Sequence, residues 1–264
     1  GTMKIVVCMK QVPDTTEVRL DPKTNTLIRE GVPSIINPDD KAGLEVALRL
    51  KDELGAHVTV LTMGPPQAES ALREALALGV DEAVLLTDRA FGGADTWATS
   101  CTIAGALKNM EYDLIITGRQ AIDGDTAQVG PQIAEHLRLS QVTYAEDLKV
   151  EGNKLIVKRQ FEDRHHIIEV KLPCLITALA ELARPRYMTV SGTFDAFKKE
   201  IKIWNLETIK EFVNLENLGL KGSPTKVKKA FPKQGKGEGV LLKDLSADEA
   251  AQVIVNKLQE KYII

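Results

Sequence analysis

The sequence predicts an α/β fold: a Rossmann-like parallel sheet with an antiparallel extension, followed by a C-terminal arm that ends in a helix. Short apolar runs alternate with helical patterns through the first half of the chain, which is typical of parallel strands joined by helical crossovers. Residues 142–170 contain runs in which polar and apolar side chains alternate, and these indicate antiparallel strands. A lysine- and glycine-rich segment follows at residues 219–239 and precedes the last helical pattern.

The first half of the chain is expected to repeat a strand and a helix four times. We predict strands at residues 4–9, 58–61, 83–86 and 114–117, helices at residues 38–54, 67–78, 94–107 and 132–137, and a small hairpin at residues 18–20 and 26–28. Asn37 suits the N-cap of the first helix, and Pro38 suits its first position. Asp39 and Asp40 suit the positive end of the helix dipole, and Gly55 suits the end of the helix.

The second half is expected to extend the sheet and then to leave it. We predict antiparallel strands at residues 142–148, 154–161 and 166–170, a buried strand at residues 174–179, a short helix at residues 193–200 and an amphipathic helix at residues 247–260. The segment at residues 219–239 has six lysines, five glycines and two prolines, and cannot bury enough apolar surface to fold alone. We therefore divide the chain into an α/β domain, residues 3–192, and an arm with its helix, residues 193–264, that packs on a partner subunit.

Composition excludes several classes of protein. The 264 residues carry a net charge of −3, and few aromatic residues stand among the lysines of the arm, so we expect no nucleic-acid partner. No apolar run approaches the roughly 20 residues of a membrane span. Cys8, Cys101 and Cys174 are far apart, which argues against a disulfide framework or a zinc site and favours reduced thiols in a cytoplasm. No Cys–His pairing can be read from the spacing, and the isolated His136 is expected to be structural.

The segment from Gly118 to Pro131 is the strongest candidate for a ligand site, because it joins a buried strand to a helix and contains three glycines. Ligands of parallel sheets bind at the carboxyl ends of the strands, which nominates the loops at residues 9–14, 62–66, 87–96 and 117–126. Backbone amides at such a turn, with a helix N-terminus, form a site for phosphate or ribose. Asp125 with Gln128 also fits a simple helix cap, so both interpretations stay open from these residues alone.

The sequence resembles the beta subunits of the electron transfer flavoproteins over essentially its whole length. The segments that carry the resemblance are residues 8–14 (CMKQVPD), 37–38 (NP), 118–131 (GRQAIDGDTAQVGP), 157–159 (VKR), 172–177 (LPCLIT) and 184–187 (RPRY). The QAID core of the third segment is specific to this family, unlike a lone glycine pattern.

The resemblance implies a sheet of the adenine nucleotide-binding type and an alpha-subunit partner that carries one FAD. It also implies a second nucleotide in this chain, which is FAD in one branch of the family and AMP in another. Carried onto this sequence, the contacts of that nucleotide are Cys8, Asn37, Pro38, Asp39, Asp40, Met63, Gly118, Arg119, Gln120, Ala121, Ile122, Asp123, Gly124, Asp125, Thr126, Ala127, Gln128 and Val129. No residue is assigned as catalytic, and none is assigned as a metal ligand.

The branch depends on residues 123–126. The AMP-binding branch carries Asp-Asp-Asp-Cys where this sequence has Asp-Gly-Asp-Thr. Gly124 removes a side chain and a charge, which favours the approach of a pyrophosphate, and Thr126 adds a neutral hydroxyl. The resemblance thus implies the electron-bifurcating branch, in which NADH reduces FAD. One electron then goes to ferredoxin or flavodoxin, and the other passes through the alpha-subunit FAD to an acyl-CoA dehydrogenase-type partner.

Two alternatives remain. Within the family, the chain is instead part of a simple electron carrier that holds AMP and accepts electrons from acyl-CoA dehydrogenases. Outside it, the chain is an adenine nucleotide-binding regulatory module without redox function.

Residues 184–192 resemble the family's loop that docks on the dehydrogenase. Tyr187 lies within this loop, and Val190 stands at its anchoring apolar position. The alternative interpretation is an ordinary loop before a helix.

Overall fold

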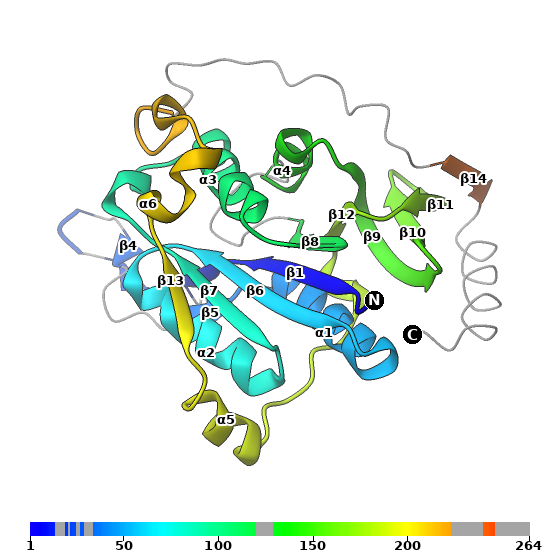
Figure 1. Cartoon of the computed structure of the whole chain (residues 1–264), viewed down its shortest axis with the longest axis horizontal. Helices are drawn as coiled ribbons and strands as arrows, with labels where there is room; N and C mark the ends of the chain where they lie inside the picture. Colours follow the sequence, from blue (N-terminus) through cyan, green and yellow to red (C-terminus); the bar gives the residue numbers. More distant parts are fainter. Residues whose placement is uncertain are drawn as a thin grey trace.

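The computed structural model describes residues 1–13, 19–20, 22–24, 27–28, 34–119, 129–222 and 240–245. Their main sheet has the strand order β13-β7-β6-β1-β8-β12-β9-β10-β11-β14 (Figure 1). The bounds of these strands are β1 Lys4–Met9, β6 His57–Met63, β7 Glu82–Leu86, β8 Leu114–Gly118, β9 Ser140–Glu151, β10 Lys154–Phe161, β11 Arg164–Lys171, β12 Cys174–Ala178, β13 Ile201–Trp204 and β14 Val240–Leu245. The predicted α/β class with a mainly parallel sheet and an antiparallel extension is confirmed.

Strand β1 lies at the centre of the parallel part of the sheet. It pairs with β6 on one side and with β8 on the other, so Val7 lies between Val60 and Ile116. The chain runs from β1 through β6 to β7 in one direction and then returns to the far side of β1 for β8. This reversal of strand order is the position where open parallel sheets bind ligands.

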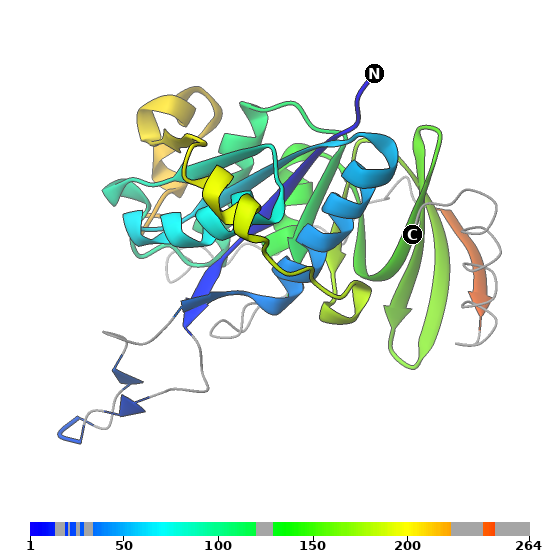
Figure 2. The ribbon, with the colours of Figure 1, turned by 90° about the horizontal axis from the view of Figure 1, so that it is seen from below.

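Helices cover both faces of the parallel strands (Figures 1 and 2). Their bounds are α1 Pro38–Leu54, α2 Glu69–Leu78, α3 Thr96–Lys108, α4 Val129–Leu137, α5 Val190–Ala196 and α6 Leu206–Ile209, with 3-10 turns at η2 Pro66–Ala68, η3 Arg89–Phe91, η4 Ala180–Leu182, η5 Lys210–Phe212 and η6 Leu215–Asn217. Helices α1 and α2 bury Leu44 and Leu72 on one face. Helices α3 and α4 bury Ile103 and Ile133 in a second core on the other face. Because apolar strands need cover on both faces, this sandwich explains why their sequences read as continuous apolar runs.

The antiparallel extension begins within β9. Its first residues pair in parallel with β12, and its later residues pair antiparallel with β10, which pairs in turn with β11. A turn at Gly152, where φ is +62°, joins β9 to β10. Strand β14 pairs antiparallel with β11 at the end of the sheet, and the sequence did not predict it.

Three further details differ from the sequence-based expectation. Helix α5 begins at Val190 and not at residue 193, because the Thr189 hydroxyl accepts a hydrogen bond from the Gly192 amide (2.9 Å) and caps the helix. Strand β13 lies inside the predicted arm and pairs with β7. The loop at residues 9–14 contains strand β2, Gln11–Pro13, which pairs with β5, Ser34–Ile36. The predicted hairpin is present as β3, Arg19–Leu20, and β4, Leu27–Ile28.

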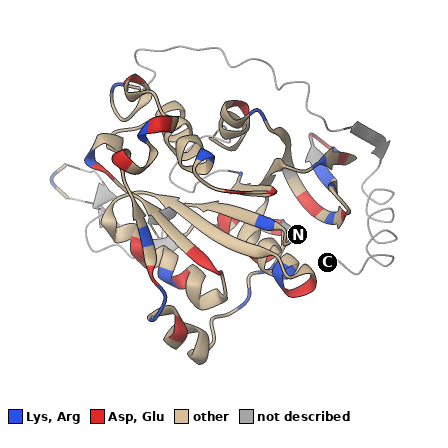
Figure 3. Ribbon diagram, viewed as in Figure 1, with Lys and Arg blue, Asp and Glu red and all other residues tan. Residues whose placement is uncertain are grey.

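The division of the chain at residue 193 stays a prediction. Residues 223–239 and 246–264, with the predicted helix at 247–260, lie outside the described residues. Charged residues of both signs are interspersed along the described elements (Figure 3). In the part of the chain that the structure describes, no helix is long and apolar enough to cross a bilayer.

Candidate functional site

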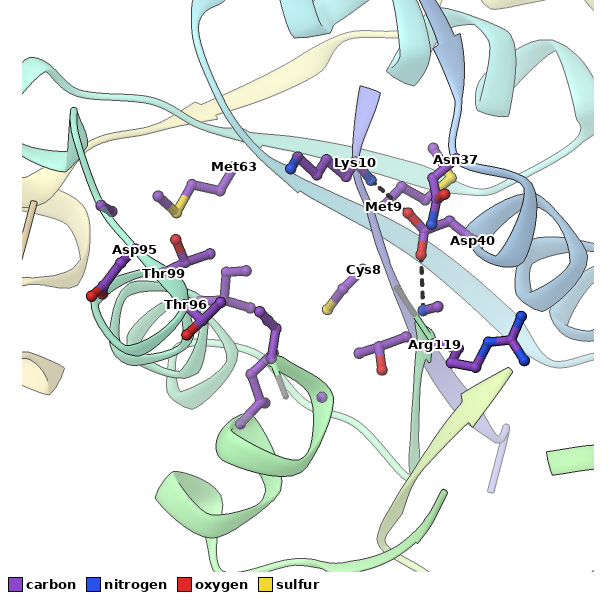
Figure 4. Close-up of a pocket in the computed structure, with 17 residues that line it drawn as sticks. Cys8, Met9, Lys10, Asn37, Asp40, Met63, Asp95, Thr96, Thr99 and Arg119 are labelled. Carbon is purple, nitrogen blue, oxygen red and sulfur yellow. Dashed lines mark hydrogen bonds between the residues drawn. The ribbon is translucent and has the colours of Figure 1, made fainter. Parts of the chain in front are cut away.

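A cleft of about 400 Å³ opens at the carboxyl ends of β1, β6 and β8, beside the reversal of strand order (Figure 4). Seven predicted contact residues line it: Cys8, Asn37, Asp40, Met63, Gly118, Arg119 and Val129. They come from segments far apart in the sequence, and the sheet brings them together. Gln120 to Gln128, nine of the predicted contacts, lie outside the described residues. All of these nucleotide contacts stay predictions.

The cleft also has walls that the sequence did not assign. They are formed by Met9, Lys10, Ala94, Asp95, Thr96, Thr99, Ile103, Thr117, Gly130 and Ile133. Half of these belong to α3 and α4, whose N-terminal ends border the cleft. Residues 94–96 belong to the loop at residues 87–96, which the sequence predicts as a candidate ligand loop, and Asp95 fits the N-cap of the helix that follows. Thr99, Ile103 and Ile133 occupy ordinary helix positions, and no local pattern marks them as residues of a cleft.

Asp40 ties three of these segments together, and we call this arrangement the Asp40 bridge. Its Oδ1 accepts a hydrogen bond from the Gly118 amide (2.8 Å), and its Oδ2 accepts one from the Lys10 amide (2.9 Å; Figure 4). The Asn37 side chain donates a third. Asn37 does occupy the N-cap position of α1, but its side chain makes no cap bond, because it is directed to Asp40 instead. The carboxylate thus joins the end of β1, the end of β8 and the start of α1.

Burial raises the pKa values of two groups that line the cleft, the Asp40 carboxyl and the Cys8 thiol. Burial raises the pKa of Asp40 to about 7, against the three hydrogen bonds, which favour the charged form. Burial, with the nearby Asp40, raises the pKa of the Cys8 thiol to about 12, so this thiol is neutral at physiological pH.

The pKa of Asp40 makes the stability of the protein depend on pH. Between the ordinary carboxyl pKa of 3.8 and about 7, the folded protein holds a proton that the unfolded chain has released. The free energy of unfolding is therefore expected to fall as the pH rises through this range, by up to about 4 kcal/mol from this group. Urea unfolding at a series of pH values tests this expectation. The slope should be reduced in Asp40→Asn, and an equal slope in both proteins would assign it to another group.

Two glycines allow the close approach of the elements around the cleft. A Cβ atom on Gly118 would lie 2.2 Å from Asp40 Oδ1, and one on Gly130 would lie 2.4 Å from Thr117 Oγ1 and 2.7 Å from Thr177 Cγ2. Gly118 therefore admits the Asp40 carboxylate, and Gly130 lets α4 pack directly on β8 and β12.

The remaining predicted contacts lie differently. Arg119 contributes its backbone to the cleft, but its guanidinium points away from Cys8 and Thr96 (Figure 4). Its Nε lies 3.7 Å from Asp39 Oδ2, so the side chain balances the charge of Asp39. Pro38 is exposed at the first turn of α1, outside the lining of the cleft.

The arrangement is suited to a phosphorylated ligand. Two helices of more than two turns, α3 and α4, start at the cleft, and helix N-termini favour anions through their dipoles and amide groups. Lys10 lines the cleft as a cation. Apolar surface from Met63, Ile103 and Ile133 suits an aromatic ring system, and the cleft volume is within the range of about 300–1,000 Å³ usual for ligand sites.

Comparisons with known proteins show the family to which the chain belongs. Residues 24–208 match the electron transfer flavoprotein domain. The chain is 62% identical to electron transfer flavoprotein subunit beta of Clostridium acetobutylicum over 262 residues, which covers 99% of this chain and 100% of the relative. It is 57% identical to the caffeyl-CoA reductase-Etf complex subunit CarD of Acetobacterium woodii, with the same coverage. It is 48% identical to the acryloyl-CoA reductase electron transfer subunit gamma of Anaerotignum propionicum, again over 99% of this chain and 100% of the relative. The chain therefore belongs to the electron transfer flavoprotein family, as a protein of the beta-subunit type.

Proposed function

We propose that this chain pairs with an alpha subunit and binds FAD in the cleft beside β1 and β8, in the cytoplasm, as part of an electron-bifurcating flavoprotein. NADH is the electron donor, and the acceptors are ferredoxin or flavodoxin and, through the alpha-subunit FAD, an acyl-CoA dehydrogenase-type enzyme. FAD, when bound, supplies both the hydride acceptance and the one-electron chemistry. The observation that carries the proposal is the cleft itself, placed at the reversal of strand order and bordered by two helix N-termini.

The residues of the cleft have distinct roles in this proposal. The N-terminal ends of α3 and α4, with Lys10, hold the phosphates, and Gly118 and Gly130 keep the surrounding elements close together. Met63 and Ile103 offer apolar contact to a ring. The Asp40 bridge acts indirectly, because it positions the ends of β1 and β8.

The names of two relatives support the proposed partner. One is a subunit of a caffeyl-CoA reductase-Etf complex, and another is the electron transfer subunit of an acryloyl-CoA reductase. Both names join an electron-transfer subunit to an enzyme that acts on an acyl-CoA thioester. The same chemistry is proposed for the partner of this chain.

The nucleotide content of the purified heterodimer tests the proposal. We expect two FAD per heterodimer after denaturation and chromatography. One FAD with one AMP would contradict bifurcation and favour the simple electron carrier. A colourless homodimer that binds ATP would favour the regulatory module instead.

Replacement of Gly124 by Asp is expected to separate the two family branches. The added carboxylate restores the charge that the AMP-binding branch carries at this position and repels a pyrophosphate. The variant should lose the second FAD, while AMP binding survives. Absorbance of the flavin and chromatography of the extracted nucleotide measure this. Unchanged FAD content would refute the role given to Gly124, which lies outside the described residues.

The proposed docking loop is strongly exposed. Tyr187 is 85% exposed and Val190 is 89% exposed, and Met188 and Phe194 lie in the same stretch of exposed apolar side chains. We propose that this surface binds the acyl-CoA dehydrogenase-type partner, because large exposed apolar patches mark interaction sites.

Arg186 fastens the start of this loop to α1. Its Nε lies 2.8 Å from Glu45 Oε2, and its outer nitrogen Nη2 lies 3.0 Å from Asp52 Oδ2. Arg186→Ala removes both contacts and, within the part of the chain that the structure describes, leaves the buried Glu45 carboxylate with only the distant Arg49 (3.8 Å). We expect about 1–3 kcal/mol of destabilisation and faster amide exchange at residues 187–190. Hydrogen exchange detected by mass spectrometry measures the second effect.

A control for Arg186→Ala is Arg73→Ala. Arg73 bonds the carbonyl oxygens of Ala196 and Lys199, so it holds the far side of α5. It should leave exchange at residues 187–190 unchanged. Equal exchange of that stretch in both variants and the parent protein would show that Arg186 does not order the loop.

A further inference from the structure

Helices α3 and α4 bring a cysteine and a histidine together outside the nucleotide cleft. Cys101 Sγ lies 3.4 Å from His136 Nε2, and Ser100 Oγ lies 3.3 Å from the same nitrogen. The side chains of Cys101 and His136 are partly exposed, whereas Cys8 and Cys174 are buried. The two residues are 35 positions apart, so the sequence alone showed no pairing.

The hydrogen bonds of Ser100 indicate that Nε2 of His136 carries a hydrogen. The Ser100 hydroxyl donates to the Trp97 carbonyl (2.8 Å), so its only proton is already used. A hydrogen bond between Ser100 and His136 then requires that the hydrogen be on Nε2 of the imidazole. The same N–H faces the Cys101 sulfur, and this arrangement stabilises a thiolate.

Two further features favour the imidazolium form of His136. It lies in the last turn of α4, where the helix dipole is negative and stabilises cations. The Trp97 ring centroid lies 4.8 Å from the imidazole centroid, within the range in which an aromatic ring attracts a cation.

We propose that Cys101 is a nucleophilic thiolate paired with His136, and that it is a modification site for soft electrophiles and for disulfides. In alkylation, the Cys101 sulfur forms a bond to carbon and displaces the leaving group, while the former thiol proton stays on His136. In exchange with a disulfide, the sulfur forms a mixed disulfide and releases the other half as a thiolate. Cys8 and Cys174 are expected to react slowly with the same reagents, since burial raises the pKa of each thiol to about 12.

The test is the alkylation rate of each cysteine in the purified full chain at pH 7, followed by peptide mass spectrometry. Iodoacetamide is the neutral probe and iodoacetate the anionic one, and the reference is the same chain unfolded in concentrated urea. Native Cys101 should react roughly threefold to tenfold faster than unfolded Cys101, since the gain in thiolate is partly offset by lower nucleophilicity. It should also favour iodoacetate over iodoacetamide more than the unfolded chain does, because an imidazolium attracts the anion.

His136→Gln should abolish both the faster rate and the preference for iodoacetate. His57→Gln is the matched control, because His57 lies on β6 and pairs with Glu82, and both effects should survive in it. Ser100→Ala keeps the Cys101–His136 pair and removes only the second acceptor at His136 Nε2, so alkylation of Cys101 should stay fast in this variant. Ser100→Ala therefore still tests the proposal if His136→Gln does not fold. Native Cys101 reacting no faster than the unfolded chain, or an unchanged iodoacetate preference in His136→Gln, would overturn the proposal.

Discussion

Gly118→Ala is expected to break the Asp40 bridge and to weaken binding of the proposed nucleotide. The new Cβ would lie 2.2 Å from Asp40 Oδ1 and 3.0 Å from the Asp40 amide nitrogen. The carboxylate can turn away only by giving up its hydrogen bond to the Gly118 amide, and the amide nitrogen cannot move away without shifting the start of α1. The overpacking and the lost hydrogen bond together should cost about 2–4 kcal/mol of unfolding free energy. Nucleotide affinity should fall at least about tenfold, because the ends of β1 and β8 separate. Urea unfolding and nucleotide retention on gel filtration measure the two effects.

Gly64→Ala is the matched control for this variant. Gly64 follows β6 at the same edge of the sheet, and the nearest neighbour of its new Cβ would be the Ala68 Cβ at 3.3 Å, a methyl group that can shift slightly. Its stability should change by less than about 0.5 kcal/mol. If Gly118→Ala were as stable as Gly64→Ala and kept its nucleotide, the Asp40 bridge would not organise the site.

Gly130→Ala is expected to lift α4 off the sheet. The added methyl group would lie between Thr117 on β8 and Thr177 on β12, closer to both than real Cβ atoms approach. Alanine favours the helix over glycine by about 1 kcal/mol, but overpacking costs about 1–3 kcal/mol, so the net effect is destabilising. Ile133 and Val129 line the cleft from α4, and their displacement should weaken nucleotide binding.

A double-mutant cycle with Thr117→Ala distinguishes this collision from a general loss of stability. Thr117 Oγ1 is buried and has no hydrogen-bond partner among the described residues, so loss of the hydroxyl costs little, and loss of the buried methyl group should cost about 1 kcal/mol. In the double variant the nearer clash is gone, and about 1 kcal/mol of the Gly130→Ala cost should return. If the two substitutions changed the free energy of unfolding additively, the cost of Gly130→Ala would not come from contact with Thr117.

The parallel half of the fold could be predicted because its signals are local. Apolar runs such as residues 114–117 and stops such as Gly55 need no knowledge of distant partners. Strands β13 and β14 depend on pairing with β7 and β11, and their short alternating sequences do not differ from exposed loops until those partners are present. The start of α5 differs from the predicted residue 193, because the Thr189 hydroxyl caps the helix three residues earlier.

Only the parts of the candidate site that lie in loops at strand ends could be predicted from the sequence. The family resemblance implied Cys8, Met63 and Gly118. Met63 and Gly118 also fall in the loops nominated by the rule that ligands bind at the carboxyl ends of parallel strands, and Cys8 directly precedes such a loop. The role of Asp40 could not be predicted, because its acceptor oxygens serve amides 30 and 78 positions away. Capping explained Asn37 well, yet in the fold its amide is directed to a carboxylate. The α3 and α4 walls likewise depend on how the helices pack.

The central position of β1 has a consequence for synthesis on the ribosome. Among the described strands of the main sheet, β1 comes first along the chain, and both of its neighbours follow it, with pairing to residue 57 on one side and to residue 114 on the other. The sheet therefore grows outward from its oldest strand. Lys10 and Asp40 can meet early, but their third partner, Gly118, is made 78 residues after Asp40. Until then the backbone edge of β1 that pairs with β8 has no partner, and unpaired strand edges make a nascent chain prone to aggregation during that interval.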